Sequence, residues 1–168
     1  MIIGQDPYND GSANGLAFSN NKNSHKPSPS LRIILREIER SFPEEVSDIH
    51  SGKLDPLDLS RWAEQGVLLL NMSLTVQEGK PMSHMVYWKA FTKAVIKALQ
   101  DKSDIVWLLM GIEAKNYSPL ISNPSHAVIE TVHPAADIYS KEDRFYGSDC
   151  FKKVNEELEA RNLSPIIW

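Results

Sequence analysis

The sequence has a single cysteine, Cys150, and no apolar run long enough to cross a bilayer. One cysteine cannot form an internal disulfide, which excludes a disulfide-stabilised secreted scaffold. The apolar stretches, such as that around residues 66–70, fall far short of the roughly 20 residues that a membrane-spanning helix needs. Gln5, Asp6 and Pro7 interrupt the apolar start at once, so the pattern of a signal peptide is also missing. We therefore expect a cytoplasmic protein with no membrane partner.

The sequence also lacks internal repeats and an excess of positive charge. Lysine and arginine total 18 against 22 aspartate and glutamate residues, for a formal net charge of −4. Because unspecific affinity for nucleic acid comes mostly from neutralised phosphates, this balance argues against a protein that coats nucleic acid. The same charge balance is compatible with a small local phosphate-binding site. With 168 residues, 42% of them hydrophobic, the chain has the length and composition of one domain, residues 1–168.

Four short apolar runs predict β-strands, and segments with helical periodicity separate them. The second and third runs are continuously apolar, as strands buried on both faces are. Because strands that alternate with helices form parallel sheets, we expect an α/β fold with three layers, α/β/α, around a central four-stranded parallel sheet. The four runs are residues 1–3, 67–70, 105–109 and 127–132.

Four further segments predict helices with one apolar face each. Ser30 is placed to cap a helix over residues 31–42, and Ser60 is placed to cap a short helix over residues 61–65 that ends at Gly66. The other two are residues 88–99, with Trp88, Phe91, Val95, Ile96 and Leu99 on the predicted buried face, and residues 151–163.

Polar side chains follow the carboxyl ends of the predicted strands. Asp6 comes soon after the first strand, Asn71 ends the second and His133 follows the fourth, with the phenol of Tyr8 nearby. Ligands of parallel α/β sheets bind outside these strand ends, so the groups are expected to meet in one pocket. Taken alone, each has a simpler interpretation: Asp6 before a proline can cap a turn, Asn71 can form a turn, and His133 can be a solvated loop residue.

Seven short motifs occur in order along the chain. They are Gly4-Gln5-Asp6-Pro7-Tyr8, Gly15-Leu16-Ala17-Phe18-Ser19, Pro29-Ser30-Leu31, residues 65–71, Leu74-Thr75-Val76, Ser83-His84 and His133-Pro134. Any one of them is weakly specific, but the ordered set is highly specific and extends over essentially the whole chain. Taken together, the motifs resemble those of family 1 uracil-DNA glycosylases.

The resemblance implies hydrolysis of the N-glycosidic bond between uracil and deoxyribose in DNA, which leaves an abasic site during base excision repair. Such an enzyme must first take the base out of the helical stack. As the bond breaks, positive charge grows on the sugar and negative charge grows on uracil. The resemblance implies that Asp6 stabilises the sugar cation and orients the attacking water, and that His133 hydrogen-bonds uracil O2. It implies no metal and no organic cofactor.

The resemblance also assigns residues that select the base. The Asn71 amide offers a donor and an acceptor to the N3 and O4 edge of uracil. Tyr8 fills the space beside C5, where the methyl group of thymine would collide, and Phe18 offers a face for stacking. Gln5 contributes backbone contacts from the same turn. Ser30 matches a phosphate contact, a role compatible with capping a helix.

Several positions depart from the family pattern. Asn9 stands where a histidine is usual, and Ala135 and Ile112 each stand where a serine is usual, so two hydroxyl contacts to the DNA backbone are missing. Asp137 places a carboxylate where an apolar side chain normally enters the duplex. We therefore expect a weak grip on DNA with a shallow salt dependence.

The apolar wedge that offsets the cost of unstacking must then be supplied by a neighbouring residue. Ile138 and Tyr139 are the candidates, and packing under the loop is the alternative for Ile138. The expected DNA-contacting residues are Ser30, Pro134, Ala135, Ile138 and Tyr139.

The resembling family usually has several tens of residues before its first strand, where this chain begins. We expect either a compact form, as in a phage or viral relative, or an incomplete product, in a bacterial or phage-infected cell. A monomer is expected, with a dimer through the uncovered face as the alternative. A proteinaceous glycosylase inhibitor and a replication protein are candidate partners.

The alternative function is non-catalytic binding of DNA or of a partner protein. The presence of Asp6, Asn71 and His133 argues against it, because only catalysis needs all three.

Overall fold

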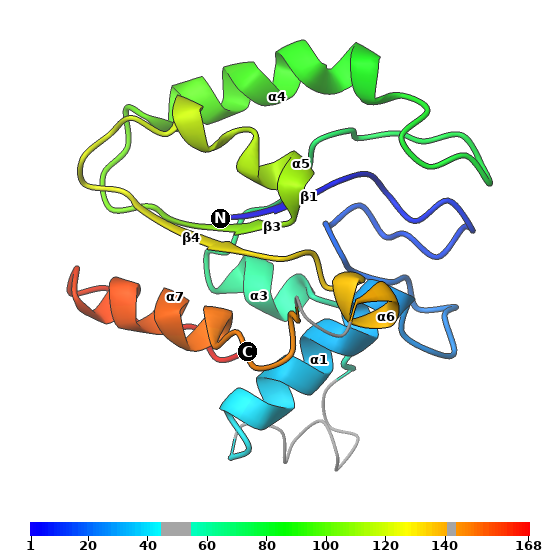
Figure 1. Ribbon diagram of the computed structural model, residues 1–168, viewed down its shortest axis with the longest axis horizontal. Coiled ribbons are helices and arrows are strands. Elements are labelled where there is room, and N and C mark those ends of the chain that lie inside the picture. The colour runs from blue at the N-terminus through cyan, green and yellow to red at the C-terminus, as the bar shows by residue number, and fades with distance from the viewer. Residues whose placement is uncertain (45–54, 141–143) are drawn as a thin grey trace.

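A parallel sheet of four strands runs through the middle of the computed structural model, which describes residues 1–44, 55–140 and 144–168 (Figure 1). The strand order is β2-β1-β3-β4. The strands are β1 (Ile2–Gly4), β2 (Leu69–Asn71), β3 (Val106–Met110) and β4 (Ala127–Thr131). All four predicted strands are present, with their bounds shifted by one or two residues.

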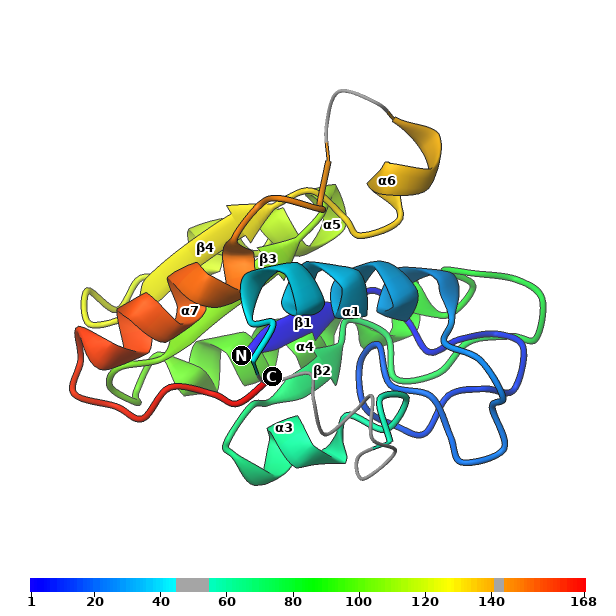
Figure 2. The ribbon, with the colours of Figure 1, turned by 90° about the horizontal axis from the view of Figure 1, so that it is seen from below.

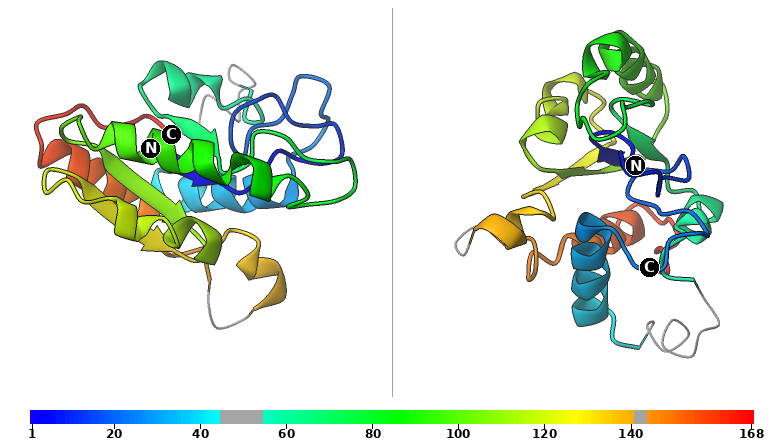
Figure 3. Two further views of the ribbon diagram at one scale, coloured as in Figure 1. Left: turned by 90° about the horizontal axis from the view of Figure 1, so that it is seen from above. Right: turned by 90° about the vertical axis from the view of Figure 1, so that its right-hand side faces the viewer.

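Helices cover both faces of this sheet, as Figures 1 and 2 show. One face carries α4 (Met85–Leu99) and α5 (Ile112–Lys115), and the other carries α1 (Pro29–Ser41), α3 (Ser60–Glu64) and α7 (Cys150–Glu159). A 3-10 turn, η1 (Ser118–Leu120), follows α5, and the short helix α6 (Ala136–Tyr139) projects from the body of the molecule (Figure 3). The predicted α/β/α layers are therefore confirmed. In the part of the chain that the structure describes, no helix is long and apolar enough to cross a membrane.

The two inner strands supply a core on each face of the sheet, because successive side chains of a strand point to opposite sides. Ile2 and Leu108 belong to the cluster that α1 and α7 cover, whereas Ile3 and Trp107 belong to the cluster beneath α4 and α5. β1 and β3 are buried along their whole length. The sheet is thus a rigid platform whose carboxyl edge can hold side chains in fixed positions.

The prediction that the run 67–70 is buried on both faces is wrong. β2 lies at the edge of the sheet, and Leu68 just before it is 41% exposed. The first strand takes the inner position instead. Strand order depends on pairing between distant segments, which the apolar pattern of one run does not contain.

Two predicted helix caps are also wrong. α1 begins at Pro29, so Ser28 is its N-cap and Ser30 lies inside the first turn. Proline is favoured at this first position because its missing N–H needs no partner there. α3 begins at Ser60 itself, with Leu59 as its N-cap. The Ser60 hydroxyl caps nothing and instead donates to the Asp58 carboxylate at 2.6 Å, which also accepts from the Ser60 N–H at 3.0 Å.

The buried face of α4 differs from the prediction in a similar way. Phe91 is 44% exposed, and the buried positions are Thr92 and Ile96. The Thr92 hydroxyl donates to the Met72 carbonyl at 2.7 Å. The spacing of apolar residues cannot predict this position, because Thr92 is polar and is buried through a hydrogen bond. At the C-terminal end, α7 stops at Glu159, and Leu163 is exposed.

A buried carboxylate joins α1 to the segment before α7. Glu37 is fully buried and accepts two hydrogen bonds from the Arg40 guanidinium, at 2.8 and 3.0 Å. It also accepts from the backbone N–H groups of Gly147 at 2.7 Å and Asp149 at 2.9 Å. A buried charge is tolerated only when it is paired and hydrogen-bonded in this way. Glu37 therefore fixes the end of the loop that carries α6.

Candidate active site

The carboxyl ends of the four strands line one edge of the sheet. Gly4 of β1 pairs with Asn71 of β2, and Met110 of β3 pairs with Thr131 of β4. The segments that follow enclose a cavity of about 220 Å³. Pockets for drug-sized ligands measure roughly 300–1,000 Å³, so this cavity suits a single small ring. Its lining residues are Gln5, Asp6, Pro7, Tyr8, Asn9, Phe18, Ser30, Asn71, Pro81 and His133.

Gly4 lets the first strand approach the second at the point where the site begins. A Cβ atom at Gly4 would lie 2.3 Å from Asn71 Oδ1 and 2.9 Å from the Ala17 Cβ. The Met72 N–H donates to the Gly4 carbonyl at 2.8 Å, which continues the pairing beyond the strand ends. Only glycine leaves room here for the Asn71 side chain.

Asn71 presents a buried amide to this cavity. The residue is 6% exposed, and among the described residues its side-chain amide has no hydrogen-bonding partner. The amide borders the cavity, so it is open to a ligand there. Its donor and acceptor are therefore available for a ligand that carries the complementary pair.

His133 is held as a neutral ring with a defined tautomer. The Ala135 N–H donates to Nδ1 at 3.1 Å, so Nδ1 is an acceptor and the ring proton is on Nε2. Burial lowers the pKa of His133 below its ordinary value, which keeps the ring neutral near pH 7. Gly111, with a φ of +89°, packs against it, and a Cβ there would lie 2.8 Å from the His133 Cβ.

Tyr8 and Phe18 form an aromatic wall of the cavity. The Tyr8 hydroxyl donates to the Phe18 carbonyl at 3.0 Å, and the Phe18 ring lies 6.2 Å from that of His133 at an angle of 44°. Phe18 has a φ of +66°, in the left-handed region. Burial raises the pKa of Tyr8, so its phenol stays neutral and donates this bond.

Asp6 is held through both carboxylate oxygens. Oδ1 accepts from the Gln5 side-chain amide at 3.2 Å, and Oδ2 accepts from the Met82 N–H at 2.6 Å. The Gln5 carbonyl accepts from the Ser73 N–H at 3.0 Å, which ties this turn to the segment after β2. The contact from its side chain to Asp6 was not predicted.

The loop before α4 also reaches the site, and sequence reasoning missed this. Pro81 lines the cavity, and the next residue bonds Asp6 through its backbone. The only signal was that this loop precedes the Ser83-His84 motif. Every residue except proline has a backbone N–H, so the sequence does not show which one reaches the carboxylate.

The other predicted DNA-contacting residues lie outside the cavity, on the segment after His133. Pro134 is buried and Ala135 is half-buried. On α6, which projects from the body (Figure 3), Ile138 is 46% and Tyr139 is 85% exposed. Ile138 therefore does not pack under the loop, which was its alternative interpretation. Tyr139 and His133 both line a neighbouring cavity of about 400 Å³.

The expectation that Asp137 presents its carboxylate to DNA is wrong. The carboxylate accepts hydrogen bonds from the backbone N–H groups of Phe145 at 2.5 Å and Tyr146 at 2.9 Å. It is turned toward its own loop, where it serves as a cap. Ile138 and Tyr139 are therefore the more exposed groups of this helix.

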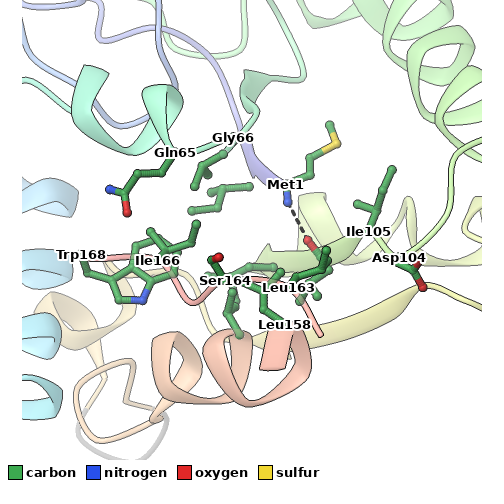
Figure 4. Close-up of a pocket in the computed structure, with 15 residues that line it drawn as sticks. Met1, Gln65, Gly66, Asp104, Ile105, Leu158, Leu163, Ser164, Ile166 and Trp168 are labelled. Atoms are coloured by element: carbon green, nitrogen blue, oxygen red, sulfur yellow. Dashed lines mark hydrogen bonds between the residues drawn. The ribbon is translucent and has the colours of Figure 1, made fainter. Parts of the chain in front are cut away.

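A further cavity of about 330 Å³ lies at the opposite end of the sheet, beside the amino ends of the strands (Figure 4). The Met1 amino group there donates to the Val106 carbonyl at 2.6 Å. Most of the lining is apolar, and none of the polar strand-end residues reaches it.

The single cysteine, Cys150, is buried. Burial raises the pKa of its thiol to about 12, so it is not a nucleophile at neutral pH. In the described ranges, no three His, Cys, Asp or Glu side chains gather where they could hold a metal ion.

The fold and the cavity define an α/β protein with room for a small polar ring at the carboxyl edge of its sheet. A carboxylate, an unpaired amide, a neutral imidazole and an aromatic wall line that cavity. The family model for the uracil DNA glycosylase superfamily matches residues 1–159. The chain belongs to this superfamily, which confirms the resemblance of its motifs.

Curated and solved relatives agree with this assignment. Uracil-DNA glycosylases of Borrelia duttonii and Streptococcus sanguinis are 44% and 42% identical over 169 and 171 residues. The alignments cover 99% and 100% of this chain, and 71% and 73% of those proteins. The mimivirus uracil-DNA glycosylase structure has a TM-score of 0.82 at 26% identity, over 99% of this chain and 66% of that one. A mimivirus UNG variant in complex with UGI has a TM-score of 0.84 at 25% identity, over 99% and 67%.

Proposed function

We propose that this chain hydrolyses the N-glycosidic bond of uracil in DNA, releasing free uracil and leaving an abasic site. The observation that carries the proposal is the buried, unpaired Asn71 amide in a ring-sized cavity that Asp6 and His133 also line. Membership of the uracil DNA glycosylase superfamily and the names of the relatives support the same reaction.

Asn71 and the aromatic wall select the base. The amide accepts from uracil N3–H and donates to O4, which satisfies the buried group. Cytosine presents the reversed pattern at this edge, leaving buried donors and acceptors unpaired, and such mismatches give large discrimination. Phe18 stacks on the ring, and Tyr8, fixed by its bond to the Phe18 carbonyl, closes the space beside C5.

Asp6 and His133 act on the two ends of the breaking bond. The bond between C1′ and N1 breaks with its electron pair going to uracil, and the oxygen of a water molecule binds C1′. The Asp6 carboxylate stabilises the positive sugar, orients the water and accepts its proton. The His133 Nε2–H donates to uracil O2 as negative charge grows there, and the neutral ring provides this donor without a proton transfer. Uracil leaves as the anion and takes a proton from solvent, and the proton on Asp6 returns to solvent.

The flipped base requires contacts with the DNA around it. Ser30, in the first turn of α1, contacts a phosphate where the N–H groups of the helix start are free. Ile138 or Tyr139, exposed on α6, enters the stack that the base has left. An inhibitor protein is a further candidate partner, since a similar mimivirus variant was solved in complex with UGI.

Uracil release from synthetic DNA tests the function. Oligonucleotides with uracil unpaired, opposite guanine and opposite adenine are compared with matched strands that carry thymine or cytosine. We expect alkali-labile abasic sites only in the uracil strands. Tight DNA binding without release, unaffected by His133→Ala, would instead support the non-catalytic alternative.

Gly4→Ala tests the close approach that leaves room for Asn71. We expect kcat/KM for uracil release to fall about 10²-fold, since the added methyl group must push the amide out of register with the base. Overpacking at a buried position should also cost about 1–3 kcal/mol of unfolding free energy. Uracil release and thermal unfolding measure the two effects. Gly66→Ala is the control, because Gly66 has a φ of +94° but open space around its Cβ position. It should lose stability and keep its activity.

The salt dependence of DNA binding should be shallow. With a net charge of −4, we expect about three neutralised phosphates or fewer. Affinity for an abasic duplex should then fall about 40-fold between about 50 and 200 mM salt, against about 10³-fold or more for 6–10 phosphate contacts. Fluorescence anisotropy across this range measures the salt dependence of the affinity. A loss of affinity ten times larger than expected would contradict weak binding of the DNA backbone.

A further inference from the structure

A bulky residue next to the active-site cavity, Met82, has a left-handed backbone conformation. The described non-glycine residues with positive φ are Phe18, Met82, Asp104, Asp149 and Asn162. Aspartate and asparagine tolerate this region, whereas a bulky side chain there is an outlier. Such outliers persist where the surroundings impose them, and they gather at functional sites. Phe18 already belongs to the cavity, which leaves Met82 to be explained.

Met82 contacts the reacting carboxylate through its backbone. Its N–H donates to Asp6 Oδ2 at 2.6 Å, while Gln5 holds the other oxygen. The Met82 side chain is 46% exposed, so apolar burial does not account for its φ of +64°. The positive φ of Met82 instead directs its N–H toward Asp6.

The loop that carries Met82 is closed on itself and docked beside Asp6. The Gln77 N–H donates to the Ser83 hydroxyl at 2.8 Å, and the Lys80 N–H donates to the Gln77 carbonyl at 3.0 Å. The Gly79 N–H donates to the Asn9 carbonyl at 3.0 Å, a second contact with the turn that holds Asp6. The position of the Met82 N–H is therefore set by the loop as a whole.

We propose that Met82 is a positioning residue, whose N–H, directed by a left-handed backbone, orients the Asp6 carboxylate toward the sugar and the attacking water. This rests on the proposed function. The side chain of Met82 has no part in it, and the loop over residues 77–83 acts on Asp6 through one backbone donor.

Two substitutions at the same position separate the backbone from the side chain. Met82→Val should lower kcat roughly tenfold to hundredfold, because a β-branched residue resists positive φ and turns the N–H away. KM should stay within about twofold, since the base pocket is untouched. Met82→Gly should keep wild-type kcat, because glycine adopts this conformation and retains the N–H. Asn162→Val, at a φ of +58° in the turn after α7, controls for general destabilisation and should keep wild-type kcat.

A double-mutant cycle shows whether Met82 acts through Asp6. In an Asp6→Ala background, Met82→Val should cause no further loss, because the group that it orients is gone. An equal loss in both backgrounds, or a Met82→Gly variant as slow as Met82→Val, would overturn the proposal. If Met82→Val does not fold, replacing residue 82 by its α-hydroxy acid removes the N–H alone and should lower kcat in the same way. A wild-type chain that releases no uracil would overturn the proposed function as well, whereas these variant outcomes bear on Met82 only.

Discussion

Asp6→Asn should lower kcat for uracil release roughly 10³-fold, with little change in KM. Asparagine keeps the shape of the side chain and an acceptor for the Met82 N–H, but it removes the negative charge that faces the positive sugar. Preorganised groups of this kind are each worth about 10²–10³ in kcat, and loss of a proton acceptor adds to this. Single-turnover release of uracil from a single-stranded oligonucleotide measures the chemical step without the contribution of the wedge.

Asp10→Asn is the matched control for this experiment. Asp10 lies in the same segment, but it is exposed, and its carboxylate accepts from the Ser12 N–H and hydroxyl instead of facing the cavity. Its loss should leave kcat unchanged. If wild type releases uracil and Asp6→Asn releases it as fast, the role assigned to Asp6 is wrong, although the function itself stands.

Asn71→Asp should convert part of the activity from uracil to cytosine. A carboxylate oxygen accepts from the N4 amino group of cytosine, and it repels the O4 oxygen of uracil. Hydrogen-bond mismatches in a buried site give discrimination of about 10⁴–10⁵, so removing the mismatch should produce cytosine release where wild type has none that can be measured. Uracil release should fall at least about 10²-fold. Product analysis by chromatography on matched uracil and cytosine strands gives both numbers.

Tyr8→Ala provides the reciprocal control for base selection. It opens the space beside C5 and should admit thymine, which differs from uracil by one methyl group. It should not admit cytosine, because the amide edge is unchanged. Cytosine release by Tyr8→Ala, or thymine release by Asn71→Asp, would show that the two residues do not read separate edges of the base.

The residues that follow the strands could be predicted because architecture alone gathers them. Asp6, Asn71 and His133 meet at one edge since the ends of parallel strands do so whatever the intervening helices are. The chemistry of each side chain then limits what the cavity can bind. This is why the site was accessible from the sequence when the order of the strands was not.

The parts that could not be predicted depend on backbone groups. Asp137 caps two N–H groups of its own loop, and Met82 reaches Asp6 with a backbone donor. Neither contact uses a side-chain pattern that distinguishes these positions from their neighbours. The edge position of β2 was missed for a related reason, because its partner is fixed by long-range pairing.

The buried carboxylate of Glu37 bears on how the chain is made. Its backbone partner Gly147 follows 110 residues later, so a chain that emerges from the ribosome contains α1 long before that partner exists. Until then Glu37 has the Arg40 guanidinium of its own helix as a partner, but it lacks the backbone donors of Gly147 and Asp149 that complete its hydrogen bonds. Completion of this half of the molecule must therefore wait until the segment around residues 147–149 has been synthesised.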